Sequence, residues 1–296
     1  MTTAAVSERS NSFARDLVML TKPRIISLLL VTTIAPMYVA GSPSIGLVCW
    51  VLLGGYLMAG GANAVNMFID SDIDEHMART RLRPIPSGRM DRRAVLAFGI
   101  LLATTATGVF ALEVNVASAA LALAGFYFYV FIYTRWLKRR TPQNIVIGGA
   151  AGAFPPLVGW AAATGHVDLA AIYLFLIVFY WTPPHFWALA LLKQTDYSRA
   201  GVPMAPLVWG ERETMWNMLW YTFILIALTL LPALFGAFGA FYVVFTVALD
   251  ALLLFGVVRV LRREVWNAHA WWLYKFSLLY LALLFAAMVI DRVIAR

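Results

Sequence analysis

Charged residues are scarce in this chain: Asp, Glu, Lys and Arg together make up 13% of its 296 residues. Soluble globular domains carry roughly 25%, so the chain has too few charged side chains to cover itself with a water-compatible surface. Cysteine is nearly absent as well, and with Cys49 alone no intrachain disulfide can form. Ten-residue segments of alternating polarity are also missing, which argues against an outer-membrane barrel.

Long apolar runs fill the sequence instead, and 62% of the residues are hydrophobic. Runs of roughly 17 to 25 residues can cross a bilayer core as helices. We therefore expect an all-α, polytopic membrane bundle of about nine transmembrane helices. The expected spans are residues 25–41, 45–68, 94–112, 116–134, 144–164, 169–191, 215–235, 238–258 and 272–290. A cytoplasmic N-terminal tail, residues 1–21, would precede a single transmembrane domain, residues 22–296.

The basic residues are distributed unevenly between the two sides of the expected bundle. Twenty of the 23 Lys and Arg residues fall on the side of the N-terminus, and the loops on the opposite side hold none. By the positive-inside rule this asymmetry predicts an N-in, C-out topology, with the long loops facing the cytoplasm. The net charge of +8 then reflects topology and contact with the lipid bilayer, and we expect no nucleic-acid partner.

The most informative polar segment lies at the inner end of the second expected span. Asn66, Asp70 and Asp74 are spaced at i, i+4 and i+8, so on a helix they share one face within about 80°, and Asp72 points elsewhere. Carboxylates at the negative end of a helix dipole repel one another and the dipole. All-oxygen ligands suit Mg²⁺, which would neutralise them. The alternative is a solvated helix end whose acids pair with the arginines that follow.

A basic loop follows the acidic segment directly. Residues 79–89 include Arg79 and Arg83, and guanidinium groups beside a carboxylate-bound cation are what a diphosphate needs for binding. The sequence has no glycine-rich P-loop with its lysine, which argues against a nucleotide as the phosphate source. Together the two segments predict a metal–diphosphate site at the inner face.

The pattern Asn66-xxx-Asp70-xxx-Asp74 followed by the arginine loop resembles the first signature of the UbiA superfamily of membrane prenyltransferases. Three further strings are similar to its haem-farnesylating branch: Leu20–Arg24, Tyr133–Pro156 and Trp181–Met204, the last opening with Trp-Thr-Pro-Pro-His-Phe-Trp. The resemblance runs from about residue 20 to the last span. In place of a second Asp-xxx-Asp motif, the chain offers Asp196 alone.

The resemblance implies a UbiA-type fold and transfer of the farnesyl group of farnesyl diphosphate to a vinyl group of haem B. Water addition would complete haem O, in the inner membrane of a bacterial cell, and haem A synthase or oxidase assembly factors would act downstream. Residue chemistry and resemblance together assign four sets of candidate residues. The catalytic set is Asp70, Asp74, Asp196 and His185; the Mg²⁺ ligands are Asn66, Asp70, Asp74 and Asp196; the diphosphate-binding set is Arg24, Arg79, Arg83, Lys138, Arg139 and Lys193; and the substrate pocket is Tyr133, Trp181, Phe186, Trp187 and Tyr197.

Two ionisable residues inside expected spans have open roles. His185 could ligate haem iron, polarise a water, or bond a carbonyl freed by the prolines beside it. Asp250 could be protonated, paired across the bundle, or functional. Two rival functions also remain: a quinone-precursor prenyltransferase of the same superfamily, and a transporter. Transporters place their ionisable residues near the midplane, whereas the acids here cluster at one mouth.

Overall fold

The computed structural model describes residues 13–262 and 266–294, and the part described is all-helical. Nine of its helices or continuous helical segments are long and apolar enough to cross a membrane, as the sequence predicts. The first four are α2 (Pro23–Ala40), α3 (Ile45–Ile69), α5 (Arg92–Val109) with its π-helical continuation η1 (Phe110–Val114), and α6 (Val116–Tyr127) with η2 (Phe128–Leu137). The other five are α7 (Asn144–Gly148) with α8 (Ala150–Thr164), α9 (Leu169–Leu192), α12 (Glu211–Leu234), α13 (Ala240–Arg262) and α14 (Asn267–Ile294).

Several of the observed helices begin before the apolar runs from which they were predicted. The helix α14 begins at Asn267 rather than at 272, and α12 begins at Glu211 rather than at 215. Hydropathy detects only the segment that lies in hydrocarbon, whereas helical hydrogen bonding continues into the polar residues on either side. The number and order of the spans are confirmed, and the N-in, C-out orientation stays a prediction.

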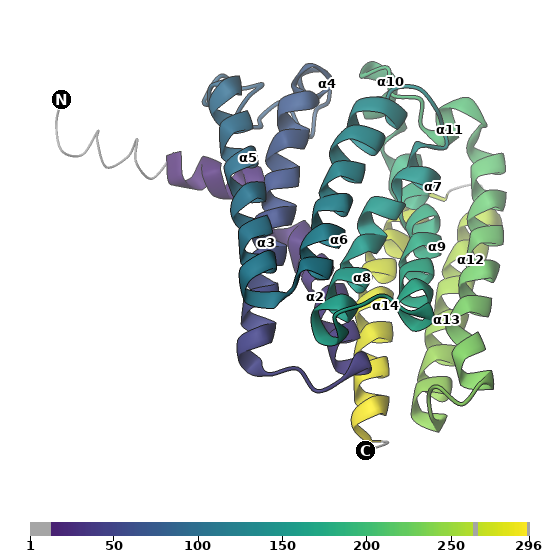
Figure 1. The fold of residues 1–296 in the computed structure, drawn as a ribbon. Helices are drawn as coiled ribbons and strands as arrows, with labels where there is room; N and C mark the ends of the chain where they lie inside the picture. The colour runs from purple at the N-terminus through teal and green to yellow at the C-terminus, as the bar shows by residue number, and fades with distance from the viewer. Residues whose placement is uncertain (1–12, 263–265, 295–296) are drawn as a thin grey trace.

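The bundle is held together by close contact between helices that are neighbours in space (Figure 1). The helix α3 packs along α5, α2 along α8, and α9 lies against α8, α12 and α14. Gly61 and Gly99 show why α3 and α5 approach so closely: a Cβ added to either would meet the backbone carbonyl oxygen of the other within 3.0 Å. Small residues permit this backbone contact in membranes, where helix association depends on packing.

Short helices gather at one end of the bundle. Figure 1 shows α4 (Ser71–Glu75) and α10 (Gln194–Arg199) at the same end, above the long helices that carry them. A further helix, residues 13–21, precedes α2, and its Leu20 is fully buried in a cluster with Met67 and Met90. The second half of the expected N-terminal tail is thus packed on the bundle. The rest of that tail lies outside the described residues.

Candidate metal and diphosphate site

The acidic motif sits where α3 ends. The helix stops at Ile69, Asp70 takes the C-cap position, and the chain restarts as α4. Asn66, Asp70 and Asp74 are buried, at 4%, 1% and 2% exposure, whereas the side chain of Asp72 is 63% exposed. The structure therefore brings the three residues of the predicted face to the interior and turns Asp72 outward.

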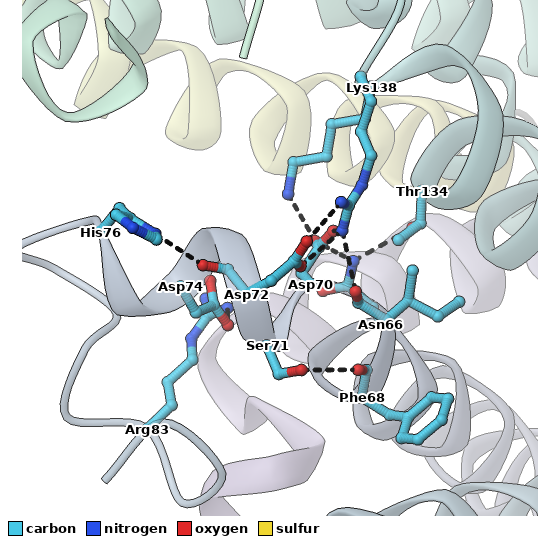
Figure 2. Close-up of polar contacts among 12 residues, drawn as sticks. Asn66, Phe68, Asp70, Ser71, Asp72, Asp74, His76, Arg83, Thr134 and Lys138 are labelled. Atoms are coloured by element: carbon cyan, nitrogen blue, oxygen red, sulfur yellow. Dashed lines mark hydrogen bonds and ion pairs between the residues drawn. The ribbon is translucent and has the colours of Figure 1, made fainter. Parts of the chain in front are cut away.

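Hydrogen bonds join Asn66 and Asp70 to a neighbouring span (Figure 2). The Asn66 amide nitrogen donates to Asp70 Oδ2 at 2.8 Å and to Thr134 Oγ1 at 3.1 Å. Lys138 Nζ donates to the same Asp70 oxygen at 2.5 Å. Thr134 and Lys138 lie at the end of η2, so this helix supplies both a polar anchor and a cation to the site.

Each acid of the motif has a cationic partner. Arg83 Nη1 donates to Asp74 Oδ2 at 2.6 Å, on the opposite side of the site from Lys138 in Figure 2. Arg139 forms a fork with Asp72, at 2.7 and 2.8 Å, and lies 3.7 Å from Asp70 Oδ1. The hydrogen bond from Arg139 is the main cause that lowers the pKa of Asp72 to about 2. Three predicted diphosphate residues, Arg83, Lys138 and Arg139, thus surround the acids.

Lys22 is a site residue that the sequence did not single out. Its Nζ donates to Asn66 Oδ1 at 3.0 Å, and burial and then the nearby Arg83 hold its pKa well below the ordinary value. Its backbone is left-handed, with φ 56° and ψ 61°. For a residue other than glycine this conformation costs about 1–3 kcal/mol and is concentrated at functional sites. The sequence signal for this residue is the Lys22-Pro23 pair at the start of the first span, where the predicted diphosphate residue was Arg24.

In the described part of the chain, the remaining predicted diphosphate and metal residues are not hydrogen-bonded to the acidic motif. Arg24 and Arg79 are exposed, and Lys193 and Asp196 are half-buried. Within residues 13–262 and 266–294, none of these four has a side-chain hydrogen bond to the acidic motif, so their roles stay predictions. Tyr197 is buried, and its pKa is raised mainly by that burial. The charge of Arg79 lowers this pKa and the charge of Asp196 raises it.

The donor set fits a divalent cation that shares its coordination with a substrate. Asp70 Oδ1 is buried and, among the described residues, has no hydrogen-bond partner. No three His, Cys, Asp or Glu side chains of the described part are grouped so that they could hold a metal ion between them. Mg²⁺ is commonly held by one or two carboxylates, with waters and substrate phosphates completing the octahedron. Asp70, Asp74 and the Asn66 amide match that arrangement.

A second polar feature lies deeper in the bundle, around His185 of α9. The imidazole ring is sandwiched between Trp181, at 4.4 Å, and Tyr274 of α14, at 4.9 Å between ring centroids. Its Nδ1 is 2.7 Å from Ser277 Oγ, and that hydroxyl donates its proton to the Tyr274 carbonyl oxygen. The imidazole must therefore donate from Nδ1, which leaves the lone pair on Nε2.

Three other predicted pocket residues lie in three different surroundings. Phe186 meets the His185 ring edge-on, at 5.1 Å, and Tyr133 stacks on Tyr129 at 5.6 Å. Trp187 is fully buried and packs on the opposite side of α9, against Trp209 and Tyr221, so it lies apart from the His185 stack.

Asp250 of α13 is hydrogen-bonded within the bundle. It accepts hydrogen bonds from Thr229 at 2.8 Å and from Tyr280 at 2.6 Å, which ties α12 and α14 to α13. Of the three readings left open by the sequence, pairing across the bundle is the one that the structure shows.

Residues 28–279 of the chain match the UbiA prenyltransferase family. The chain belongs to this family. Among solved structures, UbiA-family folds align along nearly the whole chain. A digeranylgeranylglyceryl phosphate synthase aligns with a TM-score of 0.77 at 18% identity, over 95% of this chain and 98% of that one. A UbiA homologue from Archaeoglobus fulgidus bound to DMAPP and Mg²⁺ aligns at 0.69 and 15% identity, over 92% and 99%. These likenesses show the fold.

Closer relatives of this UbiA-family protein carry the name protoheme IX farnesyltransferase. The one from Roseiflexus sp. (strain RS-1) is 53% identical over 99% of this chain, and the one from Chloroflexus aurantiacus is 54% identical over 94%. The chain spans about half the length of these two relatives, 55% and 48%. The relative from Symbiobacterium thermophilum is 50% identical over 96% of both chains.

Proposed function

We propose that this protein is a Mg²⁺-dependent protohaem IX farnesyltransferase. It would transfer the farnesyl group of farnesyl diphosphate to a vinyl group of haem B, with addition of water, and release diphosphate. The observation that supports prenyl transfer is the buried face of Asn66, Asp70 and Asp74, which Lys22, Arg83, Lys138 and Arg139 surround. The acceptor is supported by the identity of about half of all residues with the relatives named above.

The residues at the site would act on the departure of the diphosphate. Bound Mg²⁺ supplies Lewis acidity, which neutralises the negative charge that grows on the leaving group as the C1–O bond breaks. Asp70 and Asp74 would hold the ion, with Asn66 assisting. Lys138 and Arg83, which pair with these carboxylates, are then placed to donate to phosphate oxygens, and Arg24, Arg79, Arg139 and Lys193 would add donors around them.

The allylic cation needs surroundings that exclude water, since water would capture it before the acceptor does. Aromatic faces stabilise cations, and Tyr133, Trp181, Phe186, Trp187 and Tyr197 are the candidates for this role. Asp196 would act as a further metal ligand beside the diphosphate. With the N-in, C-out topology this chemistry takes place at the cytoplasmic face of the bacterial inner membrane, and haem A synthase or oxidase assembly factors would receive the product.

His185 would meet the haem rather than the diphosphate. Rings cover both faces of its imidazole and Ser277 takes Nδ1, so the Nε2 edge is the part that can reach a ligand. A neutral imidazole nitrogen is a common axial ligand of haem iron. His185→Ala should therefore change the visible spectrum of added haem while Mg²⁺-dependent binding of a farnesyl diphosphate analogue persists. An unchanged spectrum with full turnover would make the histidine structural.

One product analysis tests the proposed function. Purified protein, haem B, farnesyl diphosphate and Mg²⁺ should yield a haem whose mass has increased by one farnesyl group and one hydroxyl group, the second proton of the water being released. The same mixture with EDTA should yield none, and excess Mg²⁺ should restore the product. If haem B is returned unchanged and the wild-type protein binds no haem, the haem assignment fails. An aromatic quinone precursor, offered as the acceptor in a parallel reaction, then becomes the leading candidate.

A further inference from the structure

Two basic arms reach the acidic motif, and one ion pair outside the site joins them. The first arm is the helix of residues 13–21, which ends at Lys22. The second arm is the loop of residues 79–90, which carries Arg83. Asp16 of the first arm pairs with Arg89 of the second through two near-parallel hydrogen bonds, Nε to Oδ2 at 2.9 Å and Nη2 to Oδ1 at 3.0 Å. Neither residue has a hydrogen bond to the acidic motif among the described residues.

Arg89 is tied closely to the backbone beside Arg83. Its Nη2 donates to the Leu82 carbonyl oxygen at 3.0 Å, and its amide donates to the Pro84 carbonyl oxygen at 3.0 Å. The residues on both sides of Arg83 are therefore held by Arg89. A displacement of the Arg89 guanidinium would move the peptide from which Arg83 reaches Asp74.

The first arm is fixed in a similar way close to Lys22. The Thr21 carbonyl oxygen accepts a hydrogen bond from Asn63 at 2.9 Å, and Thr21 Oγ1 lies 2.9 Å from the Tyr56 hydroxyl. Lys22, which follows Thr21, has a left-handed backbone with φ 56°, a conformation that persists only where the surrounding structure holds it. Asp16, with a side chain 7% exposed, is the point at which this helix is anchored to the loop.

We propose that the Asp16–Arg89 pair is a positioning clamp that holds Lys22 and Arg83 at the spacing a prenyl diphosphate requires. An ion pair of which one partner is 35% exposed adds little to folding stability. A two-point guanidinium–carboxylate contact does fix both distance and orientation, which a lysine at position 89 could not do. The clamp acts on the two cations that would bind the diphosphate. It therefore rests on one part of the proposed function, the binding of a prenyl diphosphate, and does not depend on the acceptor.

The test compares Asp16→Asn, Arg89→Gln and the double variant with wild type. Displacing the two cations should lower kcat/KM for farnesyl diphosphate by about ten- to a hundredfold, mainly through KM, and leave the KM for haem B unchanged. Because both changes break one contact, the double variant should be no worse than the worse single variant. Arg93→Gln is the matched control, since it removes a nearby exposed positive charge outside this network.

A binding assay separates the clamp from the haem assignment. The affinity for a non-hydrolysable farnesyl diphosphate analogue with Mg²⁺ should fall in the same variants by the same factor, whichever acceptor the enzyme uses. If wild type binds the analogue and makes no haem O, only the acceptor is wrong. Arg89→Lys keeps the charge and should fold even where Arg89→Gln does not; an intermediate analogue affinity is expected. Wild-type affinity in Arg89→Lys, additive losses in the double variant, or equal losses toward haem B and the diphosphate would overturn the clamp.

Discussion

Asp70 and Asp72 offer a matched pair of substitutions on one helix end, two residues apart. Both become Asn, so size and shape are nearly unchanged and only one negative charge is lost. The side chain of Asp70 is 1% exposed and accepts from Lys138 and Asn66, whereas that of Asp72 is 63% exposed and pairs with Arg139. The proposed mechanism needs the charge of Asp70 and does not need that of Asp72.

The expected magnitudes differ by more than two orders of magnitude. Loss of a metal ligand that offsets charge in the transition state removes several kcal/mol; about 4 kcal/mol corresponds to a thousandfold lower kcat. An exposed ion pair is worth about 0.2–1 kcal/mol, so Asp72→Asn should lower kcat by about fivefold at most. Asp70→Asn should still fold, because the amide oxygen can accept from Lys138, which is itself 14% exposed and can reach water.

The assay is the rate of haem O formation by mass spectrometry, at saturating substrates, in protein that elutes as a single folded species in detergent. Mg²⁺ titration on each variant adds a second readout, since Asp70→Asn should also need far more Mg²⁺. Equal losses in the two variants would refute the reasoning that only the buried face holds the metal. A variant Asp70→Asn that keeps more than a tenth of wild-type kcat would refute the metal role of Asp70.

Three further predictions concern the topology, the packing of α2 against α8, and Asp196. Reporter fusions should place Gly165 outside and Arg140 inside; the same side for both would contradict the N-in, C-out topology. Gly159→Ala should lower the free energy of unfolding by about 1–3 kcal/mol, because the added Cβ would overlap the Thr33 carbonyl oxygen. In the control Gly152→Ala the added Cβ meets no atom within 4 Å, so the stability should not change. Equal unfolding temperatures of the two variants would count against tight α2–α8 packing. Asp196→Ala should weaken binding of the farnesyl diphosphate analogue and leave the haem spectrum unchanged, and a spectral change would move Asp196 to the acceptor side.

Local patterns along the chain predicted the bundle and the shared acidic face. Nine apolar runs correspond to nine spans in the described part of the chain, because the length of a helix in hydrocarbon is set by the bilayer. The spacing of Asn66, Asp70 and Asp74 predicted that they share one face. The structure buries all three, although α3 ends at Ile69 and the chain restarts as α4. The family was recognisable for the same reason, because its motifs are short and contiguous.

Only the tertiary structure decided which cation meets which acid. Lys138 pairs with Asp70 across 68 residues, and Lys22, whose backbone is left-handed, reaches Asn66, whereas Arg24 is exposed. His185 meets Ser277 from 92 residues away. Such pairs depend on the rotation and axial position of each helix against its neighbours, which are fixed by packing over the whole contact surface. No periodicity within one helix carries that information.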